Sequence, residues 1–192
     1  MKTARHQQGF SLFIVMIVML VIALLVVVTS QSSTTEMRIS ANEADRKFAL
    51  SMAESGLRDA ELRIQDFSTA AVGTVSFDYN CTGGLCLPAE PINIVDTKPR
   101  FTVNGTVPNN PIEAWKRPSS ANSRKNLLED PAARNSVAGQ ARNSNVRYII
   151  EYLGERKDDK LIRYHFRVTA RANGQNPNTA VTLQSYVEMT PP

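Results

Sequence analysis

Histidines, cysteines and catalytic motifs are scarce in this sequence of 192 residues. It has two histidines, one of them His6, and two cysteines. It contains no glycine-rich phosphate loop, no nucleophile elbow and no HExxH zinc motif. Its charged residues offer no acid/base pair on which a reaction could be based. The sequence therefore predicts a structural or assembly protein and not an enzyme, with no catalytic residues, no cofactor and no metal site.

The two cysteines, Cys81 and Cys86, enclose the residues Thr-Gly-Gly-Leu. Two thiols without a nearby histidine or a second cysteine pair make poor zinc ligands. In an oxidising compartment such a pair commonly forms a disulfide, which is the favoured interpretation, with a metal site as the alternative. Because the loop is short, the disulfide should contribute only about 2 kcal/mol in the chain-entropy model. It would staple a local turn.

Charge is absent from Phe10 to Thr35, and between Phe10 and Val28 the only polar side chain is Ser11. At about 1.5 Å per residue, the run from Phe10 to Val28 makes a helix of roughly 28 Å, which is close to the hydrocarbon thickness of a bilayer. Residues 10–35 are therefore predicted to contain a membrane-spanning helix.

Basic residues flank the beginning of this run but not its end. Lys2 and Arg5 precede it, and the next basic residue is Arg38. The positive-inside rule then predicts a single pass through the inner membrane, with a cytoplasmic N-terminus and an exported remainder. The formal net charge of +4 is too small to indicate a nucleic-acid-binding protein by itself.

Glycine and proline are also missing from Phe10 to Ser55, so the helical pattern does not stop where the apolar run ends. Apolar or small residues recur at helical spacing beyond Glu36, at Ala41, Ala44, Phe48, Met52, Gly56, Ala60 and Ile64. One helix over residues 10–66, apolar in its first half and amphipathic in its second, is the economical interpretation. A conventional signal peptide cleaved near Val28-Thr29-Ser30 is the alternative.

The region from Phe67 to Asn145 is rich in glycine, proline, asparagine and serine, with a few strand-like pieces such as Arg100 to Val107. Trp115 lies alone in a loop-like stretch. It is expected to anchor its loop on the core, with a binding platform as the alternative. Residues 119–145 are expected to form a polar surface.

The end of the chain alternates between apolar and polar residues. Three predicted strands carry the apolar sets Val146, Tyr148, Ile150 and Tyr152, then Ile162, Tyr164, Phe166, Val168 and Ala170, then Val181, Leu183, Val187 and Met189. A polar linker, 154–160, separates the first two strands, and a turn at 173–178 precedes the third. The apolar stripe of the helix needs a surface to cover. We therefore predict an α+β fold in which a long N-terminal helix packs on a small antiparallel C-terminal sheet of three or four strands.

Basic residues occupy the alternate positions of the second predicted strand, at Arg163, His165, Arg167 and Arg171. They are expected to point outward, and a solvated sheet face is the favoured interpretation. A surface for a protein partner or for DNA is the alternative. Nucleic acid is the less favoured partner, because no aromatic residues interleave on that face.

The N-terminal segment resembles the class III signal of type IV pilins and pseudopilins, because a short basic leader ends in Gly9 and an uncharged run begins at Phe10. The stretches RKFALSMAESGLRDAE (46–61) and YHFRVTARANGQNPNTAVTLQSY (164–186) are similar to the helix and the closing strands of PilX-type minor pilins. The resemblance implies the pilin fold, with a prepilin leader at 1–9, a helix at 10–66 and a periplasmic globular domain at 67–192. It also implies that prepilin peptidase cleaves between Gly9 and Phe10 and methylates the new amine of Phe10.

Ile14 departs from the family pattern. It is the fifth residue counted from Phe10, where these pilins usually carry a glutamate that pairs with the N-terminal amine of the subunit above. A subunit without this carboxylate cannot offer the pair to a subunit above it, which suits the tip of a filament. The alternative is that Ile14 is one more lipid-facing residue of a permanent anchor.

The favoured function is a minor pilin that primes type IV pilus assembly and lies at or near the filament tip. Its implied partners are other minor pilins, the major pilin and prepilin peptidase, and the resemblance allows a large tip adhesin as a further partner. The alternatives are a membrane-tethered adhesive or DNA-binding module and a K-type pseudopilin of type II secretion. The expected location is the inner membrane before assembly and the extracellular pilus fibre afterwards.

Overall fold

The computed structural model describes residues 10–139, 146–158 and 161–191. The chain divides into two compact units, with the boundary in sequence between Ala44 and Asp45. Within the described residues, a helix of 60 residues, α1, runs from Phe10 to Thr69, and the strands of one seven-stranded sheet follow it. The predicted α+β fold is confirmed.

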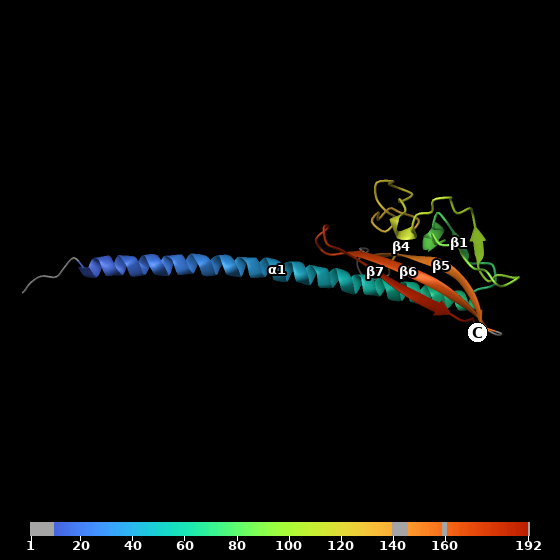
Figure 1. Ribbon diagram of the computed structural model, residues 1–192, viewed down its shortest axis with the longest axis horizontal. Coiled ribbons are helices and arrows are strands. Elements are labelled where there is room, and N and C mark those ends of the chain that lie inside the picture. Colours follow the sequence, from blue (N-terminus) through green and yellow to red (C-terminus); the bar gives the residue numbers. More distant parts are fainter. Residues whose placement is uncertain (1–9, 140–145, 159–160, 192) are drawn as a thin grey trace, which may run out of the picture. The chain divides into compact units, whose positions relative to one another are not determined.

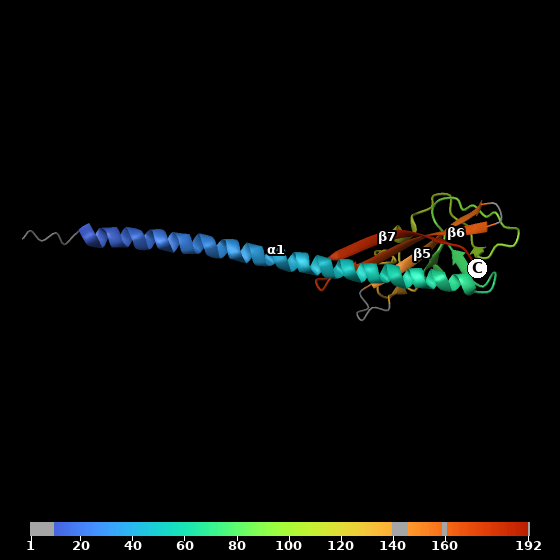
Figure 2. The same cartoon turned by 90° about the horizontal axis from the view of Figure 1, so that it is seen from below.

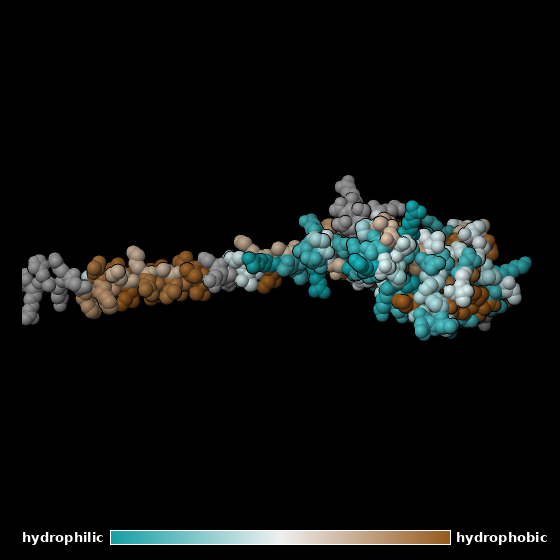
Figure 3. Space-filling model, turned by 90° about the horizontal axis from the view of Figure 1, so that it is seen from above, coloured by the Kyte–Doolittle hydropathy of each residue, from teal (hydrophilic) through white to brown (hydrophobic). Residues whose placement is uncertain are grey.

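The first unit contains the apolar part of α1. Every large apolar side chain between Phe10 and Val28 is exposed. On the face drawn in Figure 3, this segment forms a continuous apolar surface. With a mean hydropathy of 3.4 in its most apolar window, α1 is long and apolar enough to cross a membrane. A helix that is apolar all round needs lipid or neighbouring helices to cover it.

The C-terminal end of α1 is capped by an arginine from a distant loop. The Arg100 guanidinium donates hydrogen bonds to the carbonyl oxygens of Phe67 (3.2 Å), Ser68 and Ala70 (3.0 Å). The last carbonyl groups of a helix lack partners within the helix, and a cation there also complements the helix dipole. The helix therefore ends at Thr69, slightly beyond the predicted end at residue 66.

The antiparallel part of the sheet is formed by β5 (Val146–Asp158), β6 (Leu161–Asn173) and β7 (Ala180–Met189). The shorter strands are β1 (Ser76–Asp78), β2 (Leu85–Cys86), β3 (Thr102–Asn104) and β4 (Val137–Ala138). The strand order is β3-β1-β2-β5-β6-β7, and β4 also pairs with β5. The sheet is mixed and has seven strands, so the predicted antiparallel sheet of three or four strands is too small. The parallel pairs β1–β2, β1–β3 and β2–β5 were not predicted, because strands of two or three residues leave no alternation in the sequence.

The predicted linker from Gly154 to Lys160 is wrong for most of its length, because β5 continues to Asp158. Gly154 instead lies in a bulge, where the register with β6 shifts after Tyr152. Its φ is +112°, and a Cβ there would lie 2.6 Å from the carbonyl oxygen of Asn93. Glycine at the bulge lets the Asn93 segment approach β5 and pair with it.

Helix α1, from Asp45 onward, covers one face of the sheet, and loops cover the other (Figures 1 and 2). Small residues bring the helix close: Ala53 and Ala60 are fully buried, and a Cβ at Gly56 would lie 2.6 Å from Val146 Cγ2 and 3.3 Å from Ala170 Cβ. The sequence pattern predicted this stripe of α1.

Aromatic rings fill the core near the end of α1. The centroids of Phe77 and Tyr152 are 5.2 Å apart, and those of Phe67 and Phe166 are 6.3 Å apart, with Phe101 packed against all four rings. The cluster joins the helix to β1, β5 and β6, so the short strands share one core with the antiparallel hairpin.

The turn after β6 is anchored on α1. The Asp45 carboxylate accepts hydrogen bonds from the backbone N–H groups of Gln175 (2.6 Å) and Asn176 (3.3 Å), and a Cβ at Gly174 would lie 2.5 Å from Asp45 Oδ1. A hydrogen bond from the Thr179 side chain, together with these N–H groups, holds the pKa of Asp45 below its usual value. The predicted turn is thus fixed to the first residue of the second unit.

Replacing Gly56 by valine should destabilise the second unit by about 1–3 kcal/mol, because the added methyl groups overpack the contact with Val146. The matched control is Ser51→Val on an exposed position of the same helix, which should cost less than about 1 kcal/mol of helix propensity. Urea unfolding followed by circular dichroism measures both free energies. Equal losses in the two variants would contradict the close packing at Gly56.

Candidate functional site

The start of α1 is the first candidate region. Phe10 is the first described residue of α1 and is 73% exposed, and Ile14, about one turn later, is 47% exposed. The first turn carries no acidic residue. Gly9 lies outside the described residues, so cleavage between Gly9 and Phe10 stays a prediction. An apolar side chain occupies the fifth position counted from Phe10.

The second candidate region is the set of loops on the sheet face opposite α1. We call residues 108–138 the covering layer. Its apolar residues Ala114, Leu127 and Leu128 are buried in one cluster with Ile149 of β5. The layer therefore has a small core of its own, which it shares with the sheet.

The expectation that residues 119–145 form a polar surface is wrong for the buried members of this stretch, and its last part, 140–145, lies outside the described residues. Ser119 and Asp130 are buried and hydrogen-bonded to each other, and buried Ser136 donates a hydrogen bond to the carbonyl of Leu127 (2.6 Å). Arg147 of β5 donates to the carbonyl (2.7 Å) and the hydroxyl (2.6 Å) of Ser136. Polar residues can be buried here because their hydrogen bonds are made within the layer and with Arg147 of β5.

Arg167 is the clearest correction to the predicted outward basic row. It is 5% exposed, and it lies directly opposite Glu151 in the β5–β6 register. Glu151 itself is 0% exposed. The covering layer lies over this part of the sheet face, so a residue that alternation assigns to solvent is buried. For Arg167, the predicted solvated position and the alternative of an exposed partner surface are therefore both wrong.

Carboxylates surround the Arg167 guanidinium. Glu151 accepts two hydrogen bonds from it, both of 2.9 Å, and Glu90 (3.1 Å) and Glu113 (3.2 Å) accept others. The ring of Trp115 lies against the guanidinium at 4.7 Å from ring centroid to Cζ. Trp115 packs on the buried cluster of the covering layer, so it is a loop anchor, as predicted, and also part of this charged site.

The hydrogen bonds to Glu151 raise the pKa of Arg167 above its ordinary value, so the guanidinium stays charged. Burial raises the pKa of Glu151, and the hydrogen bonds from Arg167 oppose that rise. The pair joins β5 to β6, while Glu90 and Glu113 join the loops to the pair. The cluster therefore ties the loops to the sheet through charge as well as through apolar contact.

The other arginines of the basic row are also paired with carboxylates. Arg163 contacts Glu188 (2.7 Å) and Asp158 (3.3 Å). His165 Nδ1 lies 3.9 Å from Glu188, and Arg171 contacts Glu129 at 3.2 Å. The charge of the row is matched locally, so the structure presents no uncompensated basic stripe at these residues.

Cys81 and Cys86 form a disulfide, with their Cα atoms 4.1 Å apart. Both residues are fully buried. Arg117 of the covering layer donates hydrogen bonds to the carbonyls of Tyr79 (2.8 Å) and Leu87 (2.7 Å), which flank the disulfide loop. The disulfide therefore closes a local loop, as predicted. This loop is also tied to the covering layer through the hydrogen bonds of Arg117.

The Cys81→Ser change should lower the free energy of unfolding by about 2 kcal/mol, because it opens a short loop. A control is Thr82→Ser, which alters an exposed residue of the same loop and keeps the disulfide. Thermal unfolding with and without reductant measures the difference. If reductant lowers the stability of the Cys81→Ser variant as much as that of the wild type, the disulfide is not the cause.

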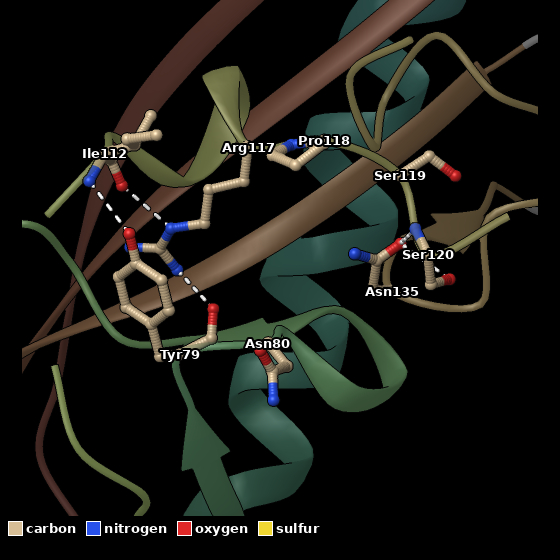
Figure 4. A pocket seen from close by; sticks show the side chains of 8 residues that line it. All are labelled: Tyr79, Asn80, Ile112, Arg117, Pro118, Ser119, Ser120 and Asn135. Carbon is tan, nitrogen blue, oxygen red and sulfur yellow. Dashed lines mark hydrogen bonds between the residues drawn. The ribbon is translucent and has the colours of Figure 1, made fainter. Parts of the chain in front are cut away.

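A cavity of about 590 Å³ opens beside the disulfide loop and the covering layer (Figure 4). Its lining residues are Tyr79, Asn80, Ile112, Arg117, Pro118, Ser119, Ser120 and Asn135. The Tyr79 hydroxyl accepts a hydrogen bond from the N–H of Ile112 (2.9 Å), and the Arg117 guanidinium lies 3.8 Å from the Tyr79 ring centroid. Apart from the buried Arg117, the lining consists of neutral amide, hydroxyl and apolar groups.

Alternation along one face of a strand does not predict the buried charged cluster. The sequence does carry a signal for it. Tyr148 to Tyr152 reads Tyr-Ile-Ile-Glu-Tyr. By alternation, the two tyrosines and Ile150 are apolar on one face of the strand, and Ile149 is apolar on the face that carries Glu151. A strand that is apolar on both faces indicates a sheet covered on both sides. A glutamate in that setting requires a cationic partner.

Comparison with protein families gives two matches. Residues 8–58 match the family described as PilX N-terminal, and residues 82–188 match the family described as type IV pilus assembly protein PilX C-term. The second match alone covers more than half of the chain. The chain belongs to the PilX family of type IV pilus assembly proteins. No curated protein and no solved structure matches it significantly.

PilX-family membership confirms the resemblance and makes the chain a pilus structural or assembly protein without a catalytic role. Other pilus components are therefore its partners. Together with the apolar start of α1, this membership fits an inner-membrane and pilus location. In the part of the chain that the structure describes, no group of three His, Cys, Asp or Glu side chains could hold a metal ion.

Proposed function

We propose that this PilX-family chain is a minor pilin that primes pilus assembly and lies at or near the filament tip. Ile14 is the observation that carries the proposal. It is an exposed apolar residue where pilins usually have a glutamate, so this subunit has no carboxylate to offer to the amine of a subunit above. A carboxylate without such a partner would be costly in the bilayer, and only the uppermost subunit lacks the partner.

The asymmetry of this contact makes the subunit a starting point for assembly. The amine of Phe10 can still pair with a carboxylate of the next subunit below. A subunit can therefore be added below this one, but this one has no carboxylate for a subunit above it. We propose that it acts with other minor pilins, that the major pilin follows, and that a large adhesin is supported at the same end. Residues 67–192 are then exported, and the N-terminus starts in the cytoplasm because Lys2 and Arg5 precede α1.

Processing by prepilin peptidase gives the proposal its first test. The mature protein in sheared pili should begin at Phe10 and carry a methyl group on its amine, which mass spectrometry of the N-terminal peptide measures. Its amount relative to the major pilin in the same sample should be low. Gly9→Val should block this maturation and leave membrane insertion intact, because the apolar run is unchanged. Gly9→Ala, a smaller change at the same position, is the matched comparison and should be cleaved more than Gly9→Val.

Two results would contradict the processing. One is a mature start at Gln31, which would indicate a conventional signal peptide. The other is normal cleavage of Gly9→Val, which would exclude a peptidase that depends on the glycine.

The basic row does not support the DNA-binding alternative, because Arg167 is buried and Arg163 and Arg171 are paired with carboxylates. A K-type pseudopilin would share the Ile14 argument and differs in the filament that it primes.

A further inference from the structure

Residues 78–82 read Asp-Tyr-Asn-Cys-Thr. The last three form the acceptor sequence for N-glycosylation, an asparagine followed by any residue except proline and then by serine or threonine. Asp78 adds a carboxylate two residues before the asparagine, which matches the longer acceptor used by bacterial oligosaccharyltransferases. A carboxylate at that place gives the transferase a second group to bind through a cationic side chain.

The structure places Asn80 at the apex of a turn. The N–H of Cys81 donates to the carbonyl of Asp78 (3.2 Å), and the N–H of Thr82 lies 3.3 Å from the Asp78 carboxylate. Asn80 is exposed, and its side chain makes no hydrogen bond with any residue that the structure describes. The amide of Asn80 is therefore free and accessible.

Asn80 also lines the cavity of about 590 Å³ beside the covering layer (Figure 4). The same cavity is lined by Tyr79 and by Ser120 and Asn135, whose side chains are hydrogen-bonded to each other. Neutral amide and hydroxyl groups next to apolar surface suit the hydroxyl groups and C–H faces of a sugar. A sugar attached to Asn80 would have space and polar partners next to its point of attachment.

We propose that Asn80 is a site of N-linked glycosylation and that the adjoining cavity receives the first sugars of the glycan. The proposal rests on the proposed export of residues 67–192, because the transferase acts on the exported side of the membrane. The donor is an oligosaccharide carried on a polyprenyl pyrophosphate.

The transfer step is a substitution at the anomeric carbon of the first sugar. Nδ2 of Asn80 forms a bond to that carbon, and the bond from the carbon to the pyrophosphate oxygen breaks. Polyprenyl pyrophosphate leaves with the electron pair, and the proton lost from Nδ2 passes to a base of the transferase and then to water. No oxidant or reductant is needed.

Asn104 provides a control within the chain. It begins a second sequence of the same short type, Asn-Gly-Thr, and is exposed, but the residue two places before it is Thr102. Its side chain also donates a hydrogen bond to Ser76 (2.8 Å). A transferase that requires the acidic residue should therefore modify Asn80 and leave Asn104 unmodified.

Mass spectrometry of the full-length protein purified from its own host tests the proposal. Trypsin separates the two asparagines, since residues 64–100 contain Asn80 and residues 101–116 contain Asn104. We expect residues 64–100 to carry an added glycan with sugar fragment ions, and residues 101–116 to have their unmodified mass. Asn80→Gln should lose the modification, Asp78→Asn should lose most of it, and Asp78→Glu should keep it.

Export is measured in the same host, by the state of the two cysteines in the purified protein and by protease accessibility of the domain in spheroplasts. If the protein is exported and Cys81–Cys86 is closed but residues 64–100 are unmodified, the glycosylation proposal is overturned and the proposed function stands. Modification of Asn104 alone, or equal modification of Asp78→Asn and Asp78→Glu, also overturns it. Free thiols in a protected domain would overturn export, and with it both proposals.

Discussion

Cells that lack this chain should carry far fewer pili than wild-type cells, while the remaining pili should be close to normal length. A subunit at the tip is needed when a filament begins, and elongation then depends on the major pilin. Electron microscopy of many cells, with pili counted and measured separately, distinguishes number from length. Normal numbers of shortened pili in the deletion strain would indicate a role in elongation and contradict priming.

Ile14→Glu is the point variant that examines the same mechanism in the intact chain. It should be cleaved normally and give no gain in pilus number, because no subunit above it offers an amine. A carboxylate without a partner in the bilayer costs about 2.5 kcal/mol or more, so insertion should be impaired. Ile14→Leu keeps an apolar side chain and should behave as the wild type. An increase in pilus number with the glutamate would show that a partner above exists.

Arg167→Leu should have the largest effect on the stability of the second unit, about 3–5 kcal/mol, because it leaves the fully buried Glu151 without its main partner. Chemical unfolding measures the loss. Arg163→Leu is the matched control, because Arg163 is a more exposed arginine on the same strand. Its ion pair with Glu188 should contribute only about 0–1 kcal/mol.

Two further measurements show whether the stability loss in Arg167→Leu comes from the unpaired charge of Glu151 or from lost packing. The double variant Arg167→Leu/Glu151→Leu removes both charges and should recover much of the stability. In Arg167→Leu alone, burial raises the pKa of Glu151 further above its unfolded value. Such a carboxyl destabilises the fold above that unfolded value, so the deficit should shrink as the pH falls from about 8 toward 5. A deficit that is independent of pH and persists in the double variant would contradict the charge argument.

The sequence predicted the elements in which one periodic pattern covers many residues. The absence of glycine and proline from Phe10 to Ser55 and the alternation at Tyr164, Phe166 and Val168 were sufficient for α1 and β6. Strands β1, β2 and β3 have two or three residues each and pair with distant segments, so no local pattern marks them. Phe77 of β1, Leu85 of β2 and Val103 of β3 instead pack in the core that these strands share with β5 and β6.

In the candidate site, the sequence predicted the disulfide but not the buried cluster around Arg167. Cys81 and Cys86 are close in sequence, and such a pair in an exported chain limits the alternatives. The environment of Arg167 depends on residues far away, Glu90 and Glu113, which arrive with loops of irregular conformation. Alternation places a side chain on a face of the sheet, but it does not say whether loops cover that face.

Immunogold labelling of intact pili, with antibodies against residues 67–192, tests the tip assignment most directly. The account predicts gold particles at filament ends, at low copy, in cells that produce the wild-type chain. Pili from the deletion strain serve as the blank for antibody specificity. Particles distributed along the shafts would contradict the tip assignment and show that the chain is an ordinary fibre subunit.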